Sequence, residues 1–427
     1  MRTTSNELKR AIGTTAILLG LGVIIMFYCD WRGTFAETIY VCRKLLWVLP
    51  AFAVVLSLLY YRRAKAEMFT NGKKEQQPRK VYLDYVRIMA AVFVILTHAC
   101  SMQRGEDVAA WRICLLTICA GLGLVCNPLY VMISGTLLLS SKKQEPIGSF
   151  YYRRFVKVVI PMVVYYSIFL CVSGQMSFLP PKNLGQGFLQ ILAGESDIVP
   201  HYWLIYTLIA LYMIAPFVKM VVYRLSDSLL RIIFWVILIW EFILTYLPLA
   251  GIQPGFLLNL LGWLGVFFAG YILTEKRTNV MEWAIIIAGA ISAIIIVLVL
   301  LKDYALLNYV CNTAPTMVLF AGAIMILMSK ADTYLSKKPL PLIQILSKYS
   351  YSIILVHWYG LFVVTWGKIG LQPLRFGCIG GIVLTVSVAT LVCLVMGFVA
   401  DNTIVFAVQS LFDTIAGLTR KSRRRMS

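Results

Sequence analysis

One apolar stretch carries three side chains whose types and spacing could do chemistry. Residues 83–100 read LDYVRIMAAVFVILTHAC and contain Asp84, Arg87 and His98. Steps of three and eleven residues are close to whole helical turns, so the three side chains share one stripe, with Arg87 about 16 Å from His98 along the axis. Because charged groups are costly in hydrocarbon, this stripe should face protein or water. Anchoring at the lipid headgroups is the alternative.

Histidine supplies a second indication of chemistry. The chain has only three histidines, His98, His201 and His357, and each lies in or beside an apolar segment. Imidazole exchanges protons near neutral pH and costs less to bury than a fixed charge, so each histidine is a candidate general base. A structural hydrogen-bonding role is the alternative for each.

Two further groups of charges stand out. The segment FYYRRFVKVVIP contains Arg153, Arg154 and Lys157, and the step of three places Arg154 and Lys157 on one helix face that could grip phosphates. The alternative is that these basic residues only anchor the cytoplasmic end of a membrane span, as the positive-inside rule describes. Glu241, inside WVILIWEFILTYL, either pairs with a buried cation or stays protonated, in a structural role or in a proton path.

The elements that position these residues are membrane helices. The 427 residues are 60% hydrophobic and 14% charged, with a mean hydropathy of +0.81, which excludes an ordinary soluble domain. We predict an all-α polytopic bundle of twelve transmembrane helices. The expected spans are 11–29, 41–60, 82–101, 113–139, 158–174, 203–222, 229–248, 256–273, 282–301, 308–328, 346–366 and 376–400.

The distribution of positive charge predicts the topology. Most of the 39 Lys and Arg residues fall in alternate loops, which places both termini in the cytoplasm. The net charge of +20 is therefore explained by topology and by contact with anionic lipids rather than by nucleic-acid binding. The ten cysteines show no metal-ligand spacing, and no metal site is expected.

The chain divides into four predicted parts. Two extra helices (1–60) precede a basic cytoplasmic linker (61–81), a ten-helix membrane domain (82–402) and a basic cytoplasmic tail (403–427). No soluble domain is present, so the protein should act within the membrane or at its surfaces.

Five segments in order resemble the integral-membrane acyltransferase family three. They are LDYVRIMAAVFVILTHA with its arginine, ten residues and histidine, PLYVMISGTLLL, YRRFVKVVIP, HYWLIYTLIALYMIAPF and LSKYSYSIILVHWYGL. The resemblance covers about 80–400 and implies transfer of an acyl group, usually acetyl from cytosolic acetyl-CoA, to a hydroxyl of a surface glycan, peptidoglycan or related acceptor. The two N-terminal helices are additional to the family's usual ten.

The resemblance also implies roles for the residues. His98 corresponds to the essential histidine, acting as a base or as a covalent acyl carrier, and Arg87 is its motif partner, held by Asp84. Arg154 and Lys157, with Arg153, are candidates for binding the CoA phosphates. Lys157 replaces an arginine that is common at this position in the family, and a lysine cannot make the two parallel hydrogen bonds of a guanidinium.

The remaining candidates are expected to line the substrate path. They are His357 with Ser350 and Tyr351 in a pore, His201 with Trp203 at an aromatic outer mouth, and Glu241.

The expected partners follow from this assignment. No cofactor is bound permanently, acyl-CoA serves as donor substrate, and the acceptor is a glycan or lipid-linked molecule, with membrane lipids around the core. A separate extracytoplasmic protein could handle the acyl group, since no hydrolase-like domain is fused at the C-terminus. The charge pattern is compatible with a bacterial plasma membrane.

Two other functions fit parts of the sequence. Intramembrane Asp, Arg, Glu and His side chains would also suit a proton-coupled secondary transporter of a small molecule. A non-catalytic scaffold for a glycan synthesis complex is the third interpretation, and it predicts that substitution of His98 leaves the phenotype intact.

Overall fold

A computed structural model describes residues 55, 58–60, 80–103, 108–141, 145–178, 181–194, 199–252, 261–337 and 341–426, with the backbone alone for 418–426. The chain divides into two compact units, Met1–Arg79 with Val395–Ser427, and Lys80–Leu394. Every candidate site residue lies in the second unit. The two predicted N-terminal helices and the predicted linker lie almost wholly outside the described residues.

The described residues are almost entirely helical. The α-helices are α3 (Tyr82–Ser101), α4 (Ala110–Gly123), α5 (Cys126–Leu139), α6 (Ile147–Arg154), α7 (Ile160–Val172), α8 (Leu184–Ala193), α9 (Trp203–Val222), α10 (Asp227–Tyr246), α11 (Gly262–Tyr271), α12 (Asn279–Lys302), α13 (Leu307–Val310), α14 (Pro315–Lys337), α15 (Pro341–Trp358), α16 (Cys378–Ala400) and α17 (Phe406–Met426).

Shorter elements connect or extend these helices. The 3₁₀ segments are η2 (Pro200–Tyr202), η3 (Leu247–Ala250) and η6 (Tyr304–Leu306), and the π-helical segments are η1 (Phe155–Val159), η5 (Ile272–Lys276), η7 (Tyr359–Ile369) and η8 (Asp401–Val405). Strands β1 (Ser177–Phe178) and β2 (Pro181–Lys182) form one antiparallel pair, with Ser177 opposite Lys182.

Nine helical segments in the described part of the chain are long and apolar enough to cross a membrane. Each overlaps one of the predicted spans, which confirms an all-α polytopic bundle. The predicted span 256–273 corresponds to α11 and η5, which together begin at Gly262, and the first two predicted spans fall mostly on residues outside the description. The count of twelve therefore stays a prediction. The region predicted as a tail continues as helix through η8 and α17.

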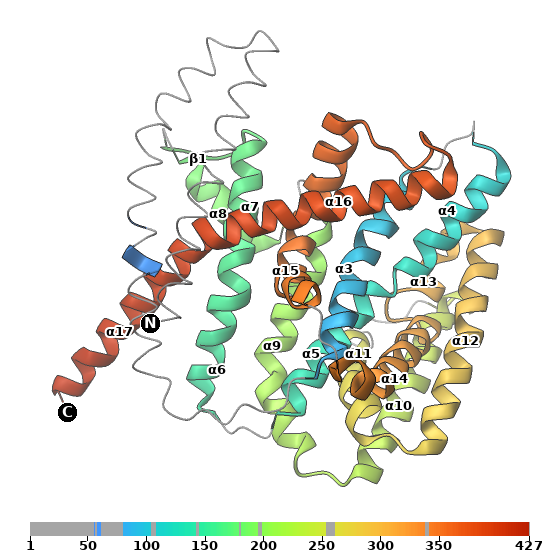
Figure 1. The fold of residues 1–427 in the computed structure, drawn as a ribbon. Coiled ribbons are helices and arrows are strands. Elements are labelled where there is room, and N and C mark those ends of the chain that lie inside the picture. Colours follow the sequence, from blue (N-terminus) through green and yellow to red (C-terminus); the bar gives the residue numbers. More distant parts are fainter. Residues whose placement is uncertain are drawn as a thin grey trace. The chain divides into compact units, whose positions relative to one another are not determined.

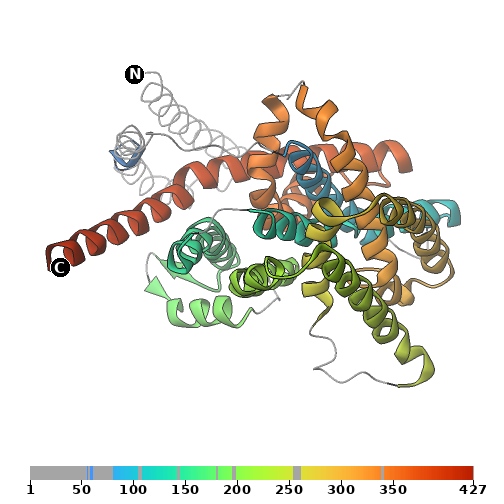
Figure 2. The same ribbon diagram turned by 90° about the horizontal axis from the view of Figure 1, so that it is seen from below.

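Helix α3 occupies the middle of the larger unit. It packs against α4, α5, α14 and α15, and Figure 1 shows it, in blue, between α4 and α15. The view turned by 90° (Figure 2) again places α3 among these helices. A stripe of polar side chains on α3 is therefore surrounded by protein, as the cost of charge in hydrocarbon requires.

Helices α5 and α11 cross at backbone contact. A Cβ atom on Gly135 would lie 1.7 Å from the carbonyl oxygen of Phe267, and one on Gly270 would lie 2.1 Å from that of Met132. Only glycine permits such an approach, and membrane helices commonly pack through small residues of this kind. The Ser-Gly sequence at 134–135 thus has a packing reason.

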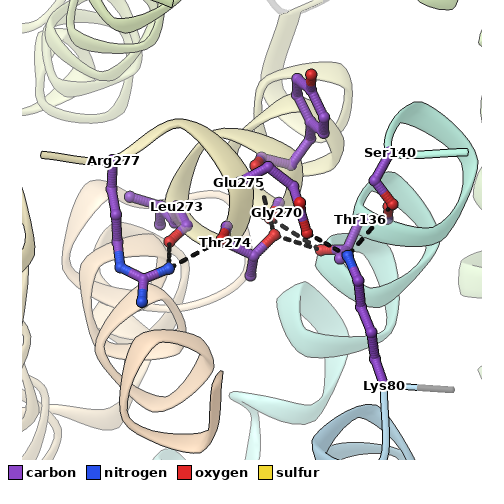
Figure 3. Close-up of polar contacts among 9 residues, drawn as sticks. Lys80, Thr136, Ser140, Gly270, Leu273, Thr274, Glu275 and Arg277 are labelled. Carbon is purple, nitrogen blue, oxygen red and sulfur yellow. Dashed lines mark hydrogen bonds and ion pairs between the residues drawn. The ribbon is translucent and has the colours of Figure 1, made fainter. Parts of the chain in front are cut away.

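Polar contacts beside this crossing close one end of the unit (Figure 3). Lys80 pairs with Glu275 and donates to Ser140 Oγ at 3.4 Å. Thr136 Oγ1 donates to the carbonyl oxygen of Gly270 at 2.8 Å, which ties α5 to α11. These contacts join segments that the charge pattern assigns to one membrane surface, and we call this the basic end.

Further ion pairs lie at the basic end. Glu282 accepts from Arg277 Nε at 2.8 Å and from Lys330 Nζ at 2.5 Å. Lys276 pairs with Asp227 at 2.7 Å, and this hydrogen bond raises the pKa of the lysine above its ordinary value. Segments around 80, 140, 227, 276 and 330 therefore lie together, as the predicted alternation of loops requires.

Candidate active site

Three helical elements bring all three histidines together. His98 comes from α3, His201 from η2 and His357 from α15. The ring centroids of His98 and His357 are 5.1 Å apart, and those of His201 and His357 are 4.4 Å apart. The sequence interpretation placed these residues at separate points along a substrate path, whereas the fold makes them one cluster.

Two of the rings are held by backbone carbonyls of α15. His201 Nε2 lies 3.2 Å from the carbonyl oxygen of Leu355, and His357 Nδ1 lies 2.7 Å from that of Ile354. Since a carbonyl oxygen only accepts, we assign the proton to these two nitrogens. In a neutral ring the other nitrogen, Nδ1 of His201 or Nε2 of His357, is then a hydrogen-bond acceptor. Neither has a hydrogen-bond partner among the described residues.

The cluster borders a cavity of about 200 Å³. His201 and His357 are 6% and 1% exposed, whereas His98 is only half-buried and is the most accessible ring of the three. The lining residues are Val94, Thr97, His98, Leu124, Cys126, Asn127, His201, Trp203, Leu204, Asn312, Ile354 and His357. We call this the histidine cavity.

Aromatic and amide groups complete the wall of the histidine cavity. The Trp358 ring lies 5.3 Å from His98 and 6.0 Å from His201, centroid to centroid. Asn127 Nδ2 donates to Asn312 Oδ1 at 3.1 Å, and Asn312 adopts a left-handed backbone with φ of 58°. Neither asparagine was among the candidates from the sequence. The sequence offered little indication of Asn312, because asparagine is common in short connections between helices and tolerates a left-handed backbone.

Asp84 and Arg87 lie toward the opposite end of α3 and do not line the histidine cavity. Arg87 Nη1 lies 3.5 Å from Asp84 Oδ1, so the step of three produces the expected ion pair. Asp84 Oδ1 also accepts from Ser347 Oγ at 2.6 Å, and Tyr130 donates its hydroxyl to the Arg87 carbonyl at 3.3 Å. These contacts tie α3 to α15 and α5.

The predicted phosphate-binding residues lie in two different settings. Arg153 and Arg154 line a cavity of about 510 Å³ near the basic end, between α6 and α9, which we call the arginine cavity. Lys157 is exposed and does not line it. A π-helical segment begins at Phe155, and its wider turn breaks the α-helical three-residue spacing. Arg154 and Lys157 therefore do not share a face at this cavity, contrary to the expectation.

Aromatic rings hold Arg154 in place. Its guanidinium lies 5.3 Å from the Phe150 ring and 5.6 Å from the Tyr212 ring, and the Tyr212 hydroxyl is 3.0 Å from Ser134 Oγ. Arg153 instead pairs with Glu145. The fixed guanidinium beside an open volume is suited to binding an anion.

Helix α9 adds a cation that sequence reasoning missed. Lys219 lines the arginine cavity, together with Pro216 and Tyr223, and its Nζ lies 5.7 Å from the Tyr223 ring. Lys219 gave little signal in the sequence because a lysine at the end of a span is the usual positive-inside residue.

The other predicted residues are dispersed. Trp203 lines the histidine cavity, but Ser350 donates to the Ser347 carbonyl at 2.8 Å and Tyr351 to the Val158 carbonyl at 3.0 Å. These two hydroxyls serve helix packing and do not line that cavity. Glu241 is buried at a separate, much smaller cavity beside Gly262. Within the described residues, no group of three or more His, Cys, Asp and Glu side chains is arranged to hold a metal ion.

The fold and site define a polytopic membrane protein with an intramembrane histidine cluster and a separate cationic cavity. Residues 80–397 match the family model described as an acyltransferase domain. The chain therefore belongs to the integral-membrane acyltransferase family three, which confirms the resemblance seen over about 80–400. It is a membrane acyltransferase that moves groups other than aminoacyl groups. No curated protein and no solved structure matches the chain.

Proposed function

We propose that this acyltransferase moves an acetyl group from cytosolic acetyl-CoA to a hydroxyl of an extracytoplasmic glycan or other cell-envelope acceptor, in the plasma membrane of a bacterium. The observation that carries the proposal is the half-buried His98 at a cavity it shares with two buried histidines. A hydroxyl is a poor nucleophile at neutral pH and needs a base at the moment of attack.

His98 is the proposed base. Its ring accepts the proton of the acceptor hydroxyl while the oxygen forms a bond to the thioester carbonyl carbon. The carbon–sulfur bond then breaks, and the CoA thiolate takes the proton from the imidazolium. The products are the O-acetylated acceptor and free CoA, with no net proton gained or lost.

The donor is proposed to bind from the basic end. CoA carries several phosphate charges, and Arg154 and Lys219 line the arginine cavity together with Arg153, which is paired with Glu145. Apolar side chains such as Leu137 and Met220 share its wall and suit the less polar pantetheine arm. Arg87, paired with Asp84 about three turns of α3 from His98, lies between the basic end and the reacting atoms.

The partners follow from this route. The acceptor reaches the histidine cavity from the side opposite the basic end, directly or from a separate acyl-handling protein, while lipids surround the bundle. The acceptor is a glycan or a lipid-linked molecule carrying free hydroxyl groups.

Transfer of radiolabel tests the proposal. Everted membrane vesicles expose the cytoplasmic face, so labelled acetyl-CoA added outside them should label an endogenous glycan. His98→Ala and His98→Gln, at equal protein level, should reduce the label at least ~100-fold because both remove the base.

The controls separate this enzyme from a carrier. A proton-coupled carrier would accumulate its substrate without acetyl-CoA and would leave no labelled product. Absence of label in the wild type, with donor and acceptor both supplied, would contradict the proposal, and full labelling by the His98 variants would remove the histidine from the mechanism.

A further inference from the structure

One short helix, at the end of the bundle opposite the basic end, has an apolar side that no described residue covers. Helix α8 connects α7, which leads away from Arg154, to α9, which leads back to Lys219, and Figure 1 shows it beside α7. Its sequence, LGQGFLQILA, contains no charged residue. Phe188, Leu189 and Leu192 are all exposed, Leu192 by 80%. A cluster of exposed apolar side chains marks a surface that binds lipid or another molecule.

Contacts with the neighbouring helices fix the depth of α8. A Cβ atom on Gly187 would lie 3.4 Å from Leu170 Cδ1, in the last turn of α7. Tyr206, in the first turn of α9, donates its hydroxyl to the Ile191 carbonyl at 2.5 Å. Helix α8 is therefore level with the ends of these two spans rather than beyond them. Its ten residues are about 15 Å long, too short to cross ~30 Å of hydrocarbon, so α8 must lie at the hydrocarbon boundary.

The residues of α8 face three different surroundings. One side of the helix packs on the bundle, a second is apolar and exposed, and a third carries both glutamines. These sides are Gly187 with Ile191, Phe188 with Leu189 and Leu192, and Gln186 with Gln190. A helix at the junction of protein, hydrocarbon and water is expected to divide in this way, because each side meets a different medium.

We propose that α8 is an interfacial helix that inserts Phe188, Leu189 and Leu192 among the phospholipid acyl chains of the outer leaflet. The neighbouring spans are the reason for choosing this occupant. Helices α7 and α9 already pass through hydrocarbon at this depth, and Val172, at the end of α7, is itself exposed. The glutamine side then faces the headgroups and water. This lipid contact lies outside both cavities and does not depend on the identity of the donor or the acceptor.

Photocrosslinking tests the proposal in the full-length protein. The photoreactive residue p-benzoylphenylalanine is placed at Leu192 and, as the matched control on the glutamine side of the same helix, at Gln186, which is also exposed. Each purified protein is reconstituted into vesicles of phosphatidylethanolamine and phosphatidylglycerol and irradiated. Mass spectrometry of the peptide that contains α8 should find at least ~5-fold more phospholipid adduct at position 192 than at position 186.

Two controls make a negative result decisive. Leu298 lies on the membrane-spanning α12 and is 62% exposed, so the same probe there should yield lipid adducts. Thermal unfolding in detergent identifies a protein that fails to fold, in which case Leu189, on the same side of α8, takes the place of Leu192.

Three results would contradict insertion into the leaflet. With lipid adducts present at position 298, equal adduct yields at positions 192 and 186 would overturn the proposal, and so would the absence of lipid adducts at position 192. Crosslinks from position 192 to another peptide of this chain, such as one from residues 1–54, would also overturn it, because protein would then cover the apolar side of α8.

Discussion

At the scale of single residues, backbone contacts give chemically identical side chains different tasks. The carbonyls of Ile354 and Leu355 fix the rings of His357 and His201, whereas no residue in the described part of the chain makes such a bond to the His98 ring. The accessible ring is therefore suited to move a proton, and the two fixed rings are suited to position a substrate. The exposure of the three side chains agrees with this division, since His98 is half-buried and His201 and His357 are almost completely enclosed.

The position of Arg154 at the arginine cavity leads to a prediction about the KM for the proposed donor. Arg154→Leu should raise the KM for acetyl-CoA ~10-fold with a smaller change in kcat, because a charge-assisted contact to phosphate is lost. Arg154→Lys should give an intermediate KM, since lysine keeps the charge but cannot stack its planar group on Phe150 and Tyr212.

The control for this measurement is another arginine of the basic end. Arg224 is exposed and does not line the arginine cavity, so Arg224→Leu should leave the KM unchanged. Initial rates of label transfer over a range of acetyl-CoA concentrations supply all three values. Equal KM values for Arg154→Leu and the wild type would show that the donor binds elsewhere.

At the scale of elements, helix crossings and π-helical turns set the geometry. The crossing of α5 and α11 brings Thr136 to the Gly270 carbonyl, and the packing of α5 against α9 brings Ser134 to the tyrosine beside Arg154. The π-helical η1 follows Arg154 directly, and its wider turn makes the side chains of Arg154 and Lys157 leave the helix in different directions. Both cavities thus depend on how helices meet rather than on any single helix.

Gly135→Ala tests the crossing. The added methyl group would lie 1.7 Å from the Phe267 carbonyl oxygen, so the backbones must separate at a cost of about 1–3 kcal/mol. The thermal unfolding midpoint of the detergent-purified protein should fall, and labelling activity should fall with it.

Gly148→Ala is the matched control. Gly148 lies in α6, and a Cβ atom there would meet no atom of the described residues within 4 Å. Alanine favours helix over glycine by about 1 kcal/mol, so this variant should unfold at the same temperature or higher. Equal midpoints for the two variants would contradict the close approach of α5 to α11.

At the scale of the whole molecule, charge determines orientation. The described contacts gather segments rich in Lys and Arg at one end of the Lys80–Leu394 unit, and the positive-inside rule assigns that end to the cytoplasm. The arginine cavity lies toward the same end, because its Tyr223 donates to the Ser141 carbonyl at 3.0 Å. Under the proposed function, a cytosolic donor and an external acceptor would then approach His98 from opposite sides.

Reporter fusions test the orientation. Green fluorescent protein attached after Ser427 should fluoresce, because it folds in the cytoplasm, and alkaline phosphatase attached there should be inactive. Alkaline phosphatase attached after Gly251, in a loop predicted to face outward, should be active. The reverse pattern at both sites would invert the topology and place the arginine cavity on the wrong side for cytosolic acetyl-CoA.

The sequence by itself determined the properties that depend on local composition and period. Apolar length predicted the membrane helices, since the hydrocarbon requires about twenty apolar residues per span, and helical period predicted the Asp84–Arg87 pair. The order of five motifs predicted the family.

Only the tertiary structure decided which distant residues meet. Residues 98, 201 and 357 come from separate helical elements, and nothing local indicates that their rings meet, because membrane helices associate through small residues and packing that leave little trace in hydropathy. For the same reason the sequence did not indicate Lys219 or Asn312, because each is a common residue type in its own segment. The π-helical turn after Arg154 likewise made the three-residue spacing a poor guide to which side chains share a face. Such a local widening of the helix depends on its packing and cannot be predicted from the spacing of residue types.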